Sequence, residues 1–268
     1  MPPRNDKAMK IRDIFEFLDS VAPFSSAQEW DNSGLLIGDM DAEVSNAIVS
    51  LDCTQETIIA AKANSAELII THHPVIFEPL KEIESGSVVW ELAKNGISVI
   101  SAHTNLDIAP NGVNAQLCQK LGFESSPAQD EPFLRIIDLD QPQSLSSLAG
   151  QIKASLGTEV LRAFEGYGEA KKIAVCCGSG GDLLGAAKSL GCDTLITGDV
   201  KHSAFIEAAN IGMNILDAGH FATEDIVVDP LAEMLAERFP EIGFAAVHSK
   251  PFSVFLIGDY NTTVFCAN

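Results

Sequence analysis

The strongest constraint on the fold of this chain is an alternation of short apolar runs with helical segments. In the first half, residues 47–51 and 68–71 are apolar runs with the length of buried strands, and residues 54–64 between them are a predicted helix that Thr54 can cap. A strand, a helix and a second strand in this order form a unit with parallel strands and a right-handed crossover. The first half is therefore predicted to contain a parallel sheet covered by helices.

The second half of the chain repeats this order. Residues 172–177 and 193–197 are predicted strands, and residues 182–190 are the predicted helix between them. The second unit ends in Thr197-Gly198-Asp199, where the first ends in Thr71-His72-His73. We therefore expect an internal structural duplication, with two similar α/β domains whose mixed sheets are flanked by helices.

The length of 268 residues is sufficient for two domains of moderate size. A turn-rich segment without clear periodicity, residues 125–132, lies between the halves, and we place the domain boundary there. The first domain is predicted to comprise residues 1–127 together with residues 250–268, on the hypothesis that the tail returns to the first sheet. The second domain is predicted to comprise residues 128–249.

Two adjacent histidines, His72 and His73, follow the apolar run 68–71 directly. Open α/β sheets hold their binding sites at the carboxyl ends of their strands, and a neutral imidazole is a common metal ligand. Adjacent histidines point in different directions. The pair therefore suits two neighbouring metal ions better than one.

Two later strand ends each carry a histidine and a carboxylate with the same spacing. His103 and Asp107 follow one predicted strand, and His220 and Glu224 follow another. If these residues turn into a helix, positions four apart share one face. Imidazole and carboxylate ligands together suit zinc, manganese, iron or nickel rather than calcium. If the domains pack face to face, these side chains form a dinuclear metal site in the cleft between them.

Chance is the alternative explanation for a single pair of this kind, since any chain with several histidines produces one. The metal hypothesis depends on four of the six histidines falling at three strand ends. Of the other two, His202 follows a further strand end and is a candidate neighbour of the site, whereas His248 is expected on the surface. The loop Gly178-Ser179-Gly180-Gly181 could contact a phosphate, but it matches no nucleotide-binding fingerprint, and a tight turn is the preferred interpretation.

Charge and composition exclude several classes of function. The chain has 17 basic and 37 acidic residues, a net charge of -20 and no basic cluster, so direct binding to nucleic acid is not expected. No apolar run is long enough to span a bilayer and no leader pattern is present, so we expect a cytoplasmic protein that does not contact membranes. None of the six cysteines belongs to a Cys-x2-Cys pair, and we expect reduced thiols that pack as small apolar side chains.

Four motifs occur in a fixed order along the chain. They are Trp30-Asp31-Asn32-Ser33-Gly34-Leu35, Thr71-His72-His73-Pro74, His103-Thr104-Asn105-Leu106-Asp107 and Gly219-His220-Phe221-Ala222-Thr223-Glu224. Together they strongly resemble the NIF-three-like family, whose members are also described as GTP cyclohydrolase I type 2 homologues. The likeness extends from about residue 11 to residue 252 and fits the compact bacterial type, because the chain is too short for the extra domain of longer relatives.

The resemblance implies two divalent metal ions per chain between the domains and assembly as a homohexamer. By motif, His73 and Asp107 would hold one ion, His72 and His220 would hold the other, and Glu224 would bridge both. The chain departs from the family at Lys201-His202-Ser203, where many relatives have a Tyr-His pair. That departure leaves the role of His202 undefined.

His103 matches a histidine that lines the site in the family, and it is our candidate catalytic residue for proton transfer. The resemblance implies a metal-dependent hydrolase with a small-molecule substrate, in which activated water attacks C8 of a guanine nucleotide and formate is released. Two alternatives remain open at this point. One is a phosphoesterase that uses the same metal pair, and the other is a metal-binding scaffold or regulatory protein without turnover.

Overall fold

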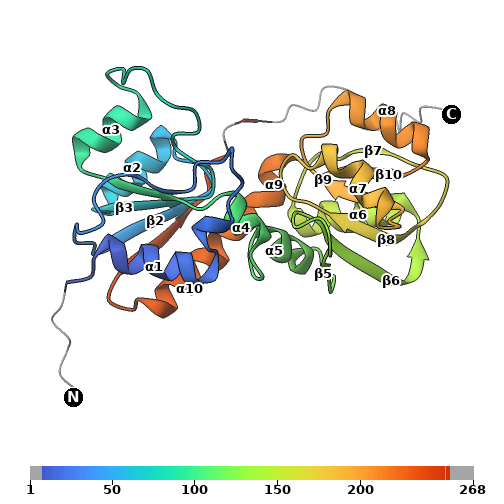
Figure 1. Ribbon diagram of the computed structural model, residues 1–268, viewed down its shortest axis with the longest axis horizontal. Helices are drawn as coiled ribbons and strands as arrows, with labels where there is room; N and C mark the ends of the chain where they lie inside the picture. Colours follow the sequence, from blue (N-terminus) through green and yellow to red (C-terminus); the bar gives the residue numbers. More distant parts are fainter. Residues whose placement is uncertain (1–7, 251, 254–268) are drawn as a thin grey trace, which may run out of the picture.

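The computed structural model describes residues 8–250 and 252–253 of the chain. Two α/β lobes lie side by side, each built on one sheet (Figure 1). Three helices, α4 (Thr104–Ile108), α5 (Val113–Lys120) and α9 (His220–Glu224), lie where the lobes meet (Figure 1). None of the helices in the described ranges has both the length and the apolar composition needed to cross a membrane. The predicted class, two α/β units with mixed sheets flanked by helices, is confirmed.

The first sheet has five strands in the order β1-β4-β3-β2-β11. Strands β2, β3, β4 and β11 are parallel, and β1 pairs with β4 in the antiparallel direction. The strands are β1 (Gly34–Ile37), β2 (Asn46–Ser50), β3 (Leu68–Thr71), β4 (Ser98–Ser101) and β11 (Gly243–Val247).

Helices cover both faces of this sheet. Val49 and Ile70 belong to the same apolar cluster as the buried residues of α1 (Ile11–Val21) and α10 (Val228–Arg238). Their neighbours in the strands, Ile48 and Ile69, pack instead with α2 (Gln55–Ala63) and α3 (Val88–Asn95). Alternate side chains of a strand point to opposite faces, so burial of both faces requires the continuous apolar runs that the sequence contains.

The second sheet has six strands in the order β5-β6-β8-β9-β10-β7. Strands β8, β9 and β10 are parallel, whereas β5, β6 and β7 are antiparallel to their neighbours. Helix α6 covers one face, and α7 and α8 cover the other. The elements are β5 (Ser126–Pro127), β6 (Arg135–Gln143), α6 (Leu145–Leu156), β7 (Arg162–Phe164), β8 (Ala170–Val175), α7 (Leu184–Ser189), β9 (Thr194–Thr197), α8 (His202–Ile211) and β10 (Asn214–Asp217).

The two sheets share an arrangement, as expected for a duplication. In the first, three parallel strands β2, β3 and β4 are followed by the antiparallel edge strand β1, and in the second β8, β9 and β10 are followed by the antiparallel strand β7. A helix of one turn follows the third parallel strand in both, α4 after β4 and α9 after β10. The lobes differ at the other edge of the three parallel strands, where β11 is parallel to β2 but β6 is antiparallel to β8.

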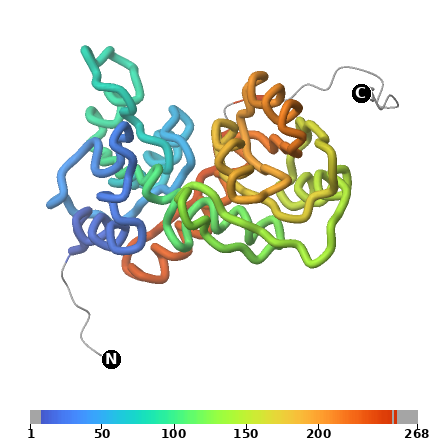
Figure 2. Tube along the Cα trace, turned by 45° about the vertical axis from the view of Figure 1, so that its right-hand side comes forward, coloured from blue at the N-terminus to red at the C-terminus, as the bar shows by residue number. Residues whose placement is uncertain are grey.

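Two short strands belong to a different lobe from the one predicted. Residues 243–247 fall in the range 128–249 given to the second domain, yet β11 pairs with β2 in the first sheet, and Figure 2 shows the end of the described chain returning to that lobe. The cause is α10, which packs against β2 and β11 and so carries the strand with it. Residues 126–127, placed in the first domain, form β5 of the second sheet. The hypothesis about the tail concerns residues that, from 254 on, lie outside the described ranges.

The lobes share one apolar core at their junction. Val113, Leu117 and Leu121, in and just after α5, belong to the same cluster as Leu148 of α6 and Val227. Val227 ends the short 3-10 helix Asp225–Val227 that connects α9 to α10. A closely packed core allows little movement of one lobe relative to the other. The side chains between the lobes are therefore held at defined distances.

Candidate metal centre

The side chains that follow β3, β4 and β10 meet between the lobes. His72 and His73 come directly after β3, and His103 precedes the first residue of α4. His220 is the first residue of α9 and Glu224 the last, so the two lie one turn apart on the same face, with Nε2 and Oε2 separated by 2.8 Å. The parallel order of the strands brings these carboxyl ends to the same edge of each sheet, as expected for an open α/β fold.

One group of side chains consists of His73, His220 and Glu224. The Oε2 atom of Glu224 lies 2.9 Å from Nε2 of His73 and 2.8 Å from Nε2 of His220. The two Nε2 atoms are 3.2 Å apart. Three donor atoms from both lobes therefore converge on one small volume that could hold a metal ion.

A second group consists of His72, Asp107 and Glu224. Nε2 of His72 lies 3.4 Å from Oδ1 of Asp107 and 3.9 Å from Oε2 of Glu224. This group could also hold a metal ion, and it shares Glu224 with the first. The distances thus associate His72 with Asp107 and His73 with His220, which differs from the pairing that the family motifs implied.

Each of the four histidines has its Nδ1 atom occupied by an oxygen of the protein. This contact fixes the orientation of the ring and directs Nε2 away from it. The pairs are His72 with the carbonyl oxygen of Ala102 (2.9 Å), His73 with Asp52 (2.7 Å), His103 with Asp31 (2.8 Å) and His220 with Asp199 (2.8 Å). The Nε2 atoms of His72, His73 and His220 are consequently available to the centre.

The donor set fits a metal ion. Nε2 of His72 is buried and has no hydrogen-bond partner among the described residues, which is costly for a polar atom unless something else binds it. Asp107 and Glu224 are also buried, and no lysine or arginine in the described part of the chain forms an ion pair with either carboxylate. Buried carboxylates need a compensating positive charge, which divalent ions would supply.

Burial and neighbouring charges shift the pKa values of these groups in different directions. Burial, with the negative charge of Glu224 nearby, raises the pKa of Asp107 to about 7. Burial lowers the pKa of His72 to about 4, despite the attraction of Glu224. His72 is therefore a neutral imidazole near neutral pH, the form in which its Nε2 can donate a lone pair.

The pKa values of His73 and His220 are raised, in contrast to that of His72. Burial alone would lower the pKa of His73, but hydrogen bonds with Asp52 and Glu224 outweigh it and raise the pKa to about 10. The same balance, with Glu224 and Asp199 as partners, raises the pKa of His220 to about 9. Hydrogen bonds from the two histidines likewise hold the pKa of Glu224 well below its usual range, although burial opposes this.

Two glycines of the second lobe leave the space that Glu224 and His220 occupy. A Cβ atom on Gly178, whose φ is +57°, would lie 2.0 Å from Oε1 of Glu224, and one on Gly198 would collide with the backbone at His220. Within the loop 178–181, the amide of Gly178 donates to Thr223 and that of Gly180 donates to Thr197. The loop is therefore a tight turn that seats Glu224, and these two amides are not free to bind a phosphate.

His103 lies beside the two groups. Its ring centroid is 5.2 Å from that of His72 and 5.7 Å from that of His73, and a donor atom of His103 falls in a third cluster with these two residues. Asp31 binds Nδ1 of His103 and also accepts hydrogen bonds from the amide and hydroxyl of Thr104. The imidazole is thus held at the edge of the centre by a carboxylate that is itself fixed.

Three carboxylates that orient the histidines were not predicted from the sequence. Asp52 lies two residues after β2 and Asp199 two residues after β9, so the strand-end argument applied to histidines would have found both. Asp31 stands in the quoted motif that begins at Trp30, but only the fold places it next to His103. Cys177, which was predicted only to pack as a small apolar side chain, also contacts the centre. Its buried thiol donates a hydrogen bond to Oδ1 of Asp107 at 3.1 Å.

The two remaining histidines do not join the centre. His202 is exposed at the first position of α8, and none of the potential metal clusters in the described chain contains it. His248 is partly exposed and binds Asp225 through Nδ1 (2.7 Å) and Asp229 through Nε2 (3.2 Å). The expectation of a surface position holds for His248, and His202 belongs to neither of the two groups that share Glu224.

Known proteins share both the sequence pattern and the fold. The family model described as Duf34/NIF3 (NGG1p interacting factor 3) matches residues 9–251. A Clostridium perfringens protein named GTP cyclohydrolase 1 type 2 homolog is 38% identical over 242 residues, which cover 86% of this chain and 92% of that protein. A Helicobacter pylori protein named GTP cyclohydrolase 1 type 2 is 33% identical over 230 residues, covering 84% and 91%.

The solved structures agree with these sequence matches. The crystal structure of a hypothetical protein from Staphylococcus aureus superposes with a TM-score of 0.86 at 28% sequence identity. The superposition covers 93% of this chain and 100% of the other. The two-lobed fold is therefore shared over almost the whole chain.

Proposed function

Because the chain belongs to the Duf34/NIF3 family, we propose that it is a metal-dependent hydrolase that acts on a purine nucleotide. The observation that carries the proposal is the position of Glu224, a buried carboxylate common to two groups of potential ligands. Closely spaced ions that share a carboxylate are typical of enzymes that hydrolyse their substrates. Relatives named GTP cyclohydrolase 1 type 2 support the choice of a guanine nucleotide as substrate.

The residues of each group would hold one divalent ion, and zinc, manganese, iron and nickel all suit these ligands. His73 and His220 would hold the first and His72 and Asp107 the second, with Glu224 between them. When bound, such ions lower the pKa of water and polarise the bond under attack. Three protein side chains for each ion, one of them shared, leave room for water and substrate.

His103 is the candidate for proton transfer. Its Nδ1 atom donates to Asp31, so in the neutral ring Nε2 carries the lone pair and can accept a proton from an attacking water molecule. The carboxylate of Asp31 then stabilises the positive ring until Nε2 returns the proton to a leaving nitrogen. Hydrogen bonds from His103 and Thr104 keep the pKa of Asp31 well below its usual range against the effect of burial, so it remains ionised throughout.

The proposed reaction opens the imidazole portion of guanine. A first water adds at C8 and the bond from C8 to one ring nitrogen breaks, which leaves a formamide on the other nitrogen; a second water hydrolyses this formamide and releases formate. Each cleavage requires one proton for the departing nitrogen, and His103 would supply it. The same residues could act on a phosphoester, in which case GTP would yield phosphate and no formate.

The test begins with protein purified without an affinity tag, because such tags bind metal. Elemental analysis is expected to give two ions per chain, and GTP incubated with metal-loaded protein is expected to release formate. Removal of the ions with a chelator should abolish formate release, and their return should restore it. Two ions without any formate would overturn the cyclohydrolase activity and favour a phosphoesterase or a scaffold.

Substitution of the shared carboxylate tests the assignment of the ligands. Glu224→Ala is expected to remove most of the bound metal, because both groups lose a ligand. Glu237→Ala, which changes an exposed glutamate on α10, is the matched control and should retain both ions. Full metal occupancy in the Glu224 variant would contradict the shared position of this residue.

The homohexamer implied by the family resemblance belongs to the same proposal. Sedimentation velocity on the metal-loaded protein distinguishes a hexamer from a monomer of 28.6 kDa. A single species at the monomer mass would contradict this part of the proposal and leave the metal centre untouched.

A further inference from the structure

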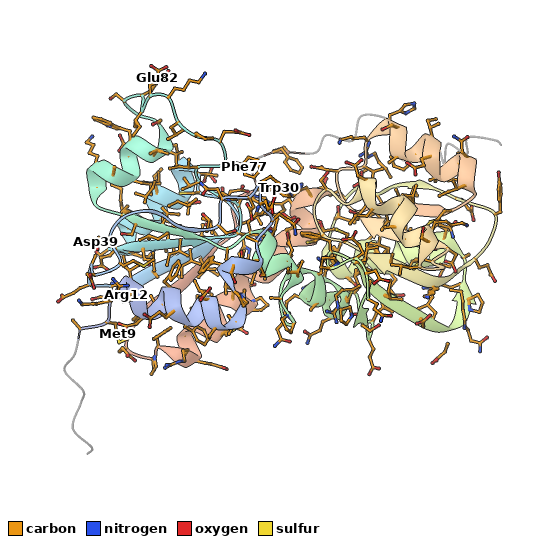
Figure 3. The ribbon with its side chains drawn as sticks, in the orientation of Figure 1. Met9, Arg12, Trp30, Asp39, Phe77 and Glu82 are labelled. Atoms are coloured by element: carbon orange, nitrogen blue, oxygen red, sulfur yellow. The ribbon has the colours of Figure 1, made fainter. Side chains whose placement is uncertain are left out.

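Two large aromatic side chains lie exposed beside His103. Trp30 is 62% exposed and Phe77 is 47% exposed, and their ring centroids are 6.1 Å apart. The centroid of the His103 ring lies 6.3 Å from that of Trp30 and 6.2 Å from that of Phe77. Figure 3 shows Trp30 and Phe77 together on the side of the first lobe that faces the second. The three rings therefore form a nearly equilateral triangle at the edge of the candidate metal centre.

Both aromatic residues lie close in sequence to residues of the centre or to a residue that orients one. Trp30 is followed by Asp31, the carboxylate that binds Nδ1 of His103. Phe77 comes four residues after His73, in the loop that leaves the end of β3. Their positions are thus tied through the backbone to the groups proposed to perform the chemistry.

Hydrogen bonds connect the two loops that carry these rings. The side-chain amide of Asn32 donates to the carbonyl oxygen of Ile76 at 2.6 Å, which links a residue near Trp30 to the neighbour of Phe77. The carboxylate of Asp31 accepts hydrogen bonds from Ser33 and Thr104 and is completely covered. The rings are therefore exposed on a rigid support, which reduces the entropy lost when a ligand binds.

We propose that Trp30 and Phe77 form a stacking platform for the planar heterocycle of the substrate, an inference that rests on the proposed function. The planes of the two rings are inclined by 57°, so a flat ligand can lie against one face and meet the other ring with its edge. The ring of His103 stands nearly perpendicular to both, at 78° and 83°. A fused ring stacked on the platform would present its edge to His103.

The chemistry of the platform selects a flat, aromatic ligand. Stacking on an aromatic side chain accepts any heterocyclic base, because every base has a π-face, whereas a phosphate has no such face. No lysine or arginine forms a cation–π contact with Trp30 or Phe77 within the described ranges. The platform would consequently bind the base of a nucleotide and leave its phosphates to other groups.

Fluorescence offers a direct test, because the chain contains only two tryptophans. Trp90→Phe leaves Trp30 as the single tryptophan, and its emission can be followed during titration with guanosine, GTP and ribose 5-phosphate. Guanosine and GTP are expected to quench the emission with saturation, and ribose 5-phosphate is expected to leave it unchanged. Quenching by none of the three, or equally by ribose 5-phosphate, would overturn the platform.

Substitutions provide a second test that does not depend on fluorescence. Trp30→Leu and Phe77→Leu are each expected to weaken guanosine binding about 10-fold in calorimetric titrations while the metal content stays at the wild-type value. Trp90→Leu removes an aromatic ring that is 40% exposed on α3 and is the matched control, with unchanged affinity. Unchanged affinity in the Trp30 and Phe77 variants, with a change in sedimentation instead, would show that the rings contact a second copy of the chain.

The two proposals can fail separately. Guanosine binding that depends on Trp30 and Phe77, combined with no formate from GTP, would support the platform and overturn the cyclohydrolase activity. Formate release at the wild-type KM in both variants would support the activity and overturn the platform.

Discussion

The Nε2 atoms of His73 and His220 lie 3.2 Å apart, although the residues are separated by 147 positions and belong to different lobes. Each ring has its Nδ1 atom against an aspartate and its Nε2 atom against Glu224. If both rings are protonated, two Nε2–H groups face each other at this distance, and if both are neutral, two lone pairs face a carboxylate; a metal ion between the three atoms removes either conflict. The contact between the lobes is therefore itself a reason to expect a metal ion.

Replacement of His103 by alanine is expected to lower turnover by roughly 10²–10⁴-fold, because it removes the group proposed to transfer protons. The metal content should remain at the wild-type value, since the two groups that share Glu224 do not include His103. Elemental analysis and formate release, measured on the same preparation, check both points. Loss of metal together with activity would assign His103 to coordination instead.

Gly178→Ala is expected to weaken metal binding by about 10-fold or more, because the added Cβ would meet Oε1 of Glu224 at 2.0 Å and displace the carboxylate. Gly157→Ala is the matched control. Gly157 has a similar φ of +61° but no atom within 4 Å of the added Cβ, so this variant should lose about 1 kcal/mol of stability and retain its ions. Equal metal affinity in the two variants, measured by competition with a chelator, would contradict the role of Gly178.

Asp52→Ala removes the carboxylate that binds Nδ1 of His73 at 2.7 Å. The metal affinity is expected to fall about 10- to 100-fold, because the ring loses the partner that fixes its orientation. Asp130→Ala changes an exposed aspartate in the turn before β6 and should have no effect. A variant at Asp52 that binds metal as tightly as the control would show that packing alone orients His73.

The contribution of Asp31 to stability should depend on pH. Hydrogen bonds from His103 and Thr104 outweigh the effect of burial and hold the pKa of Asp31 well below its unfolded value of about 3.9. A group with a lowered pKa in the folded state stabilises the fold above its unfolded pKa, and this contribution is lost as the pH falls toward the folded value. Asp31→Asn should therefore cost about 2 kcal/mol near neutral pH and less in acid.

Urea unfolding of the metal-free wild type and Asp31→Asn proteins, over a pH series from neutral to about 2.5, measures this difference. Metal must be removed from both, since its own loss in acid would otherwise dominate the result. A difference in the free energy of unfolding that stays constant over the series would contradict the ionised state assigned to Asp31.

Much of the site could be predicted from local sequence. His72 and His73 follow an apolar run that is recognisable as a buried strand, and the carboxyl end of such a strand is where an α/β fold holds its ligands. The spacing of His220 and Glu224 places them on one face of a helical turn, which the structure has as α9. The positions of these residues in the fold could be predicted because they depend on periodicity and chain direction, which are properties of neighbouring residues.

Other features follow from contacts between distant segments. The amino-acid composition of β11 is that of an ordinary short strand and does not indicate which sheet it joins. The packing of α10 on β2 and β11 places it in the first sheet. His72 lies near Asp107, and His73 lies near His220, because of the way the two lobes dock. The family motifs alone implied a different pairing of these residues. Hydrogen bonds and packing between residues far apart in the chain determine these choices, and no local pattern encodes them.

The sequence by itself determined the two α/β units, the five potential ligands and their positions at strand ends. The tertiary structure decided the geometry: which histidine faces which carboxylate, the aspartates behind His73, His103 and His220, and the place of Trp30 and Phe77 beside the centre. The physical reason is that secondary structure follows from short-range periodicity, whereas a binding site is a set of distances across the junction of two lobes. Those distances are set by the shared core around α5.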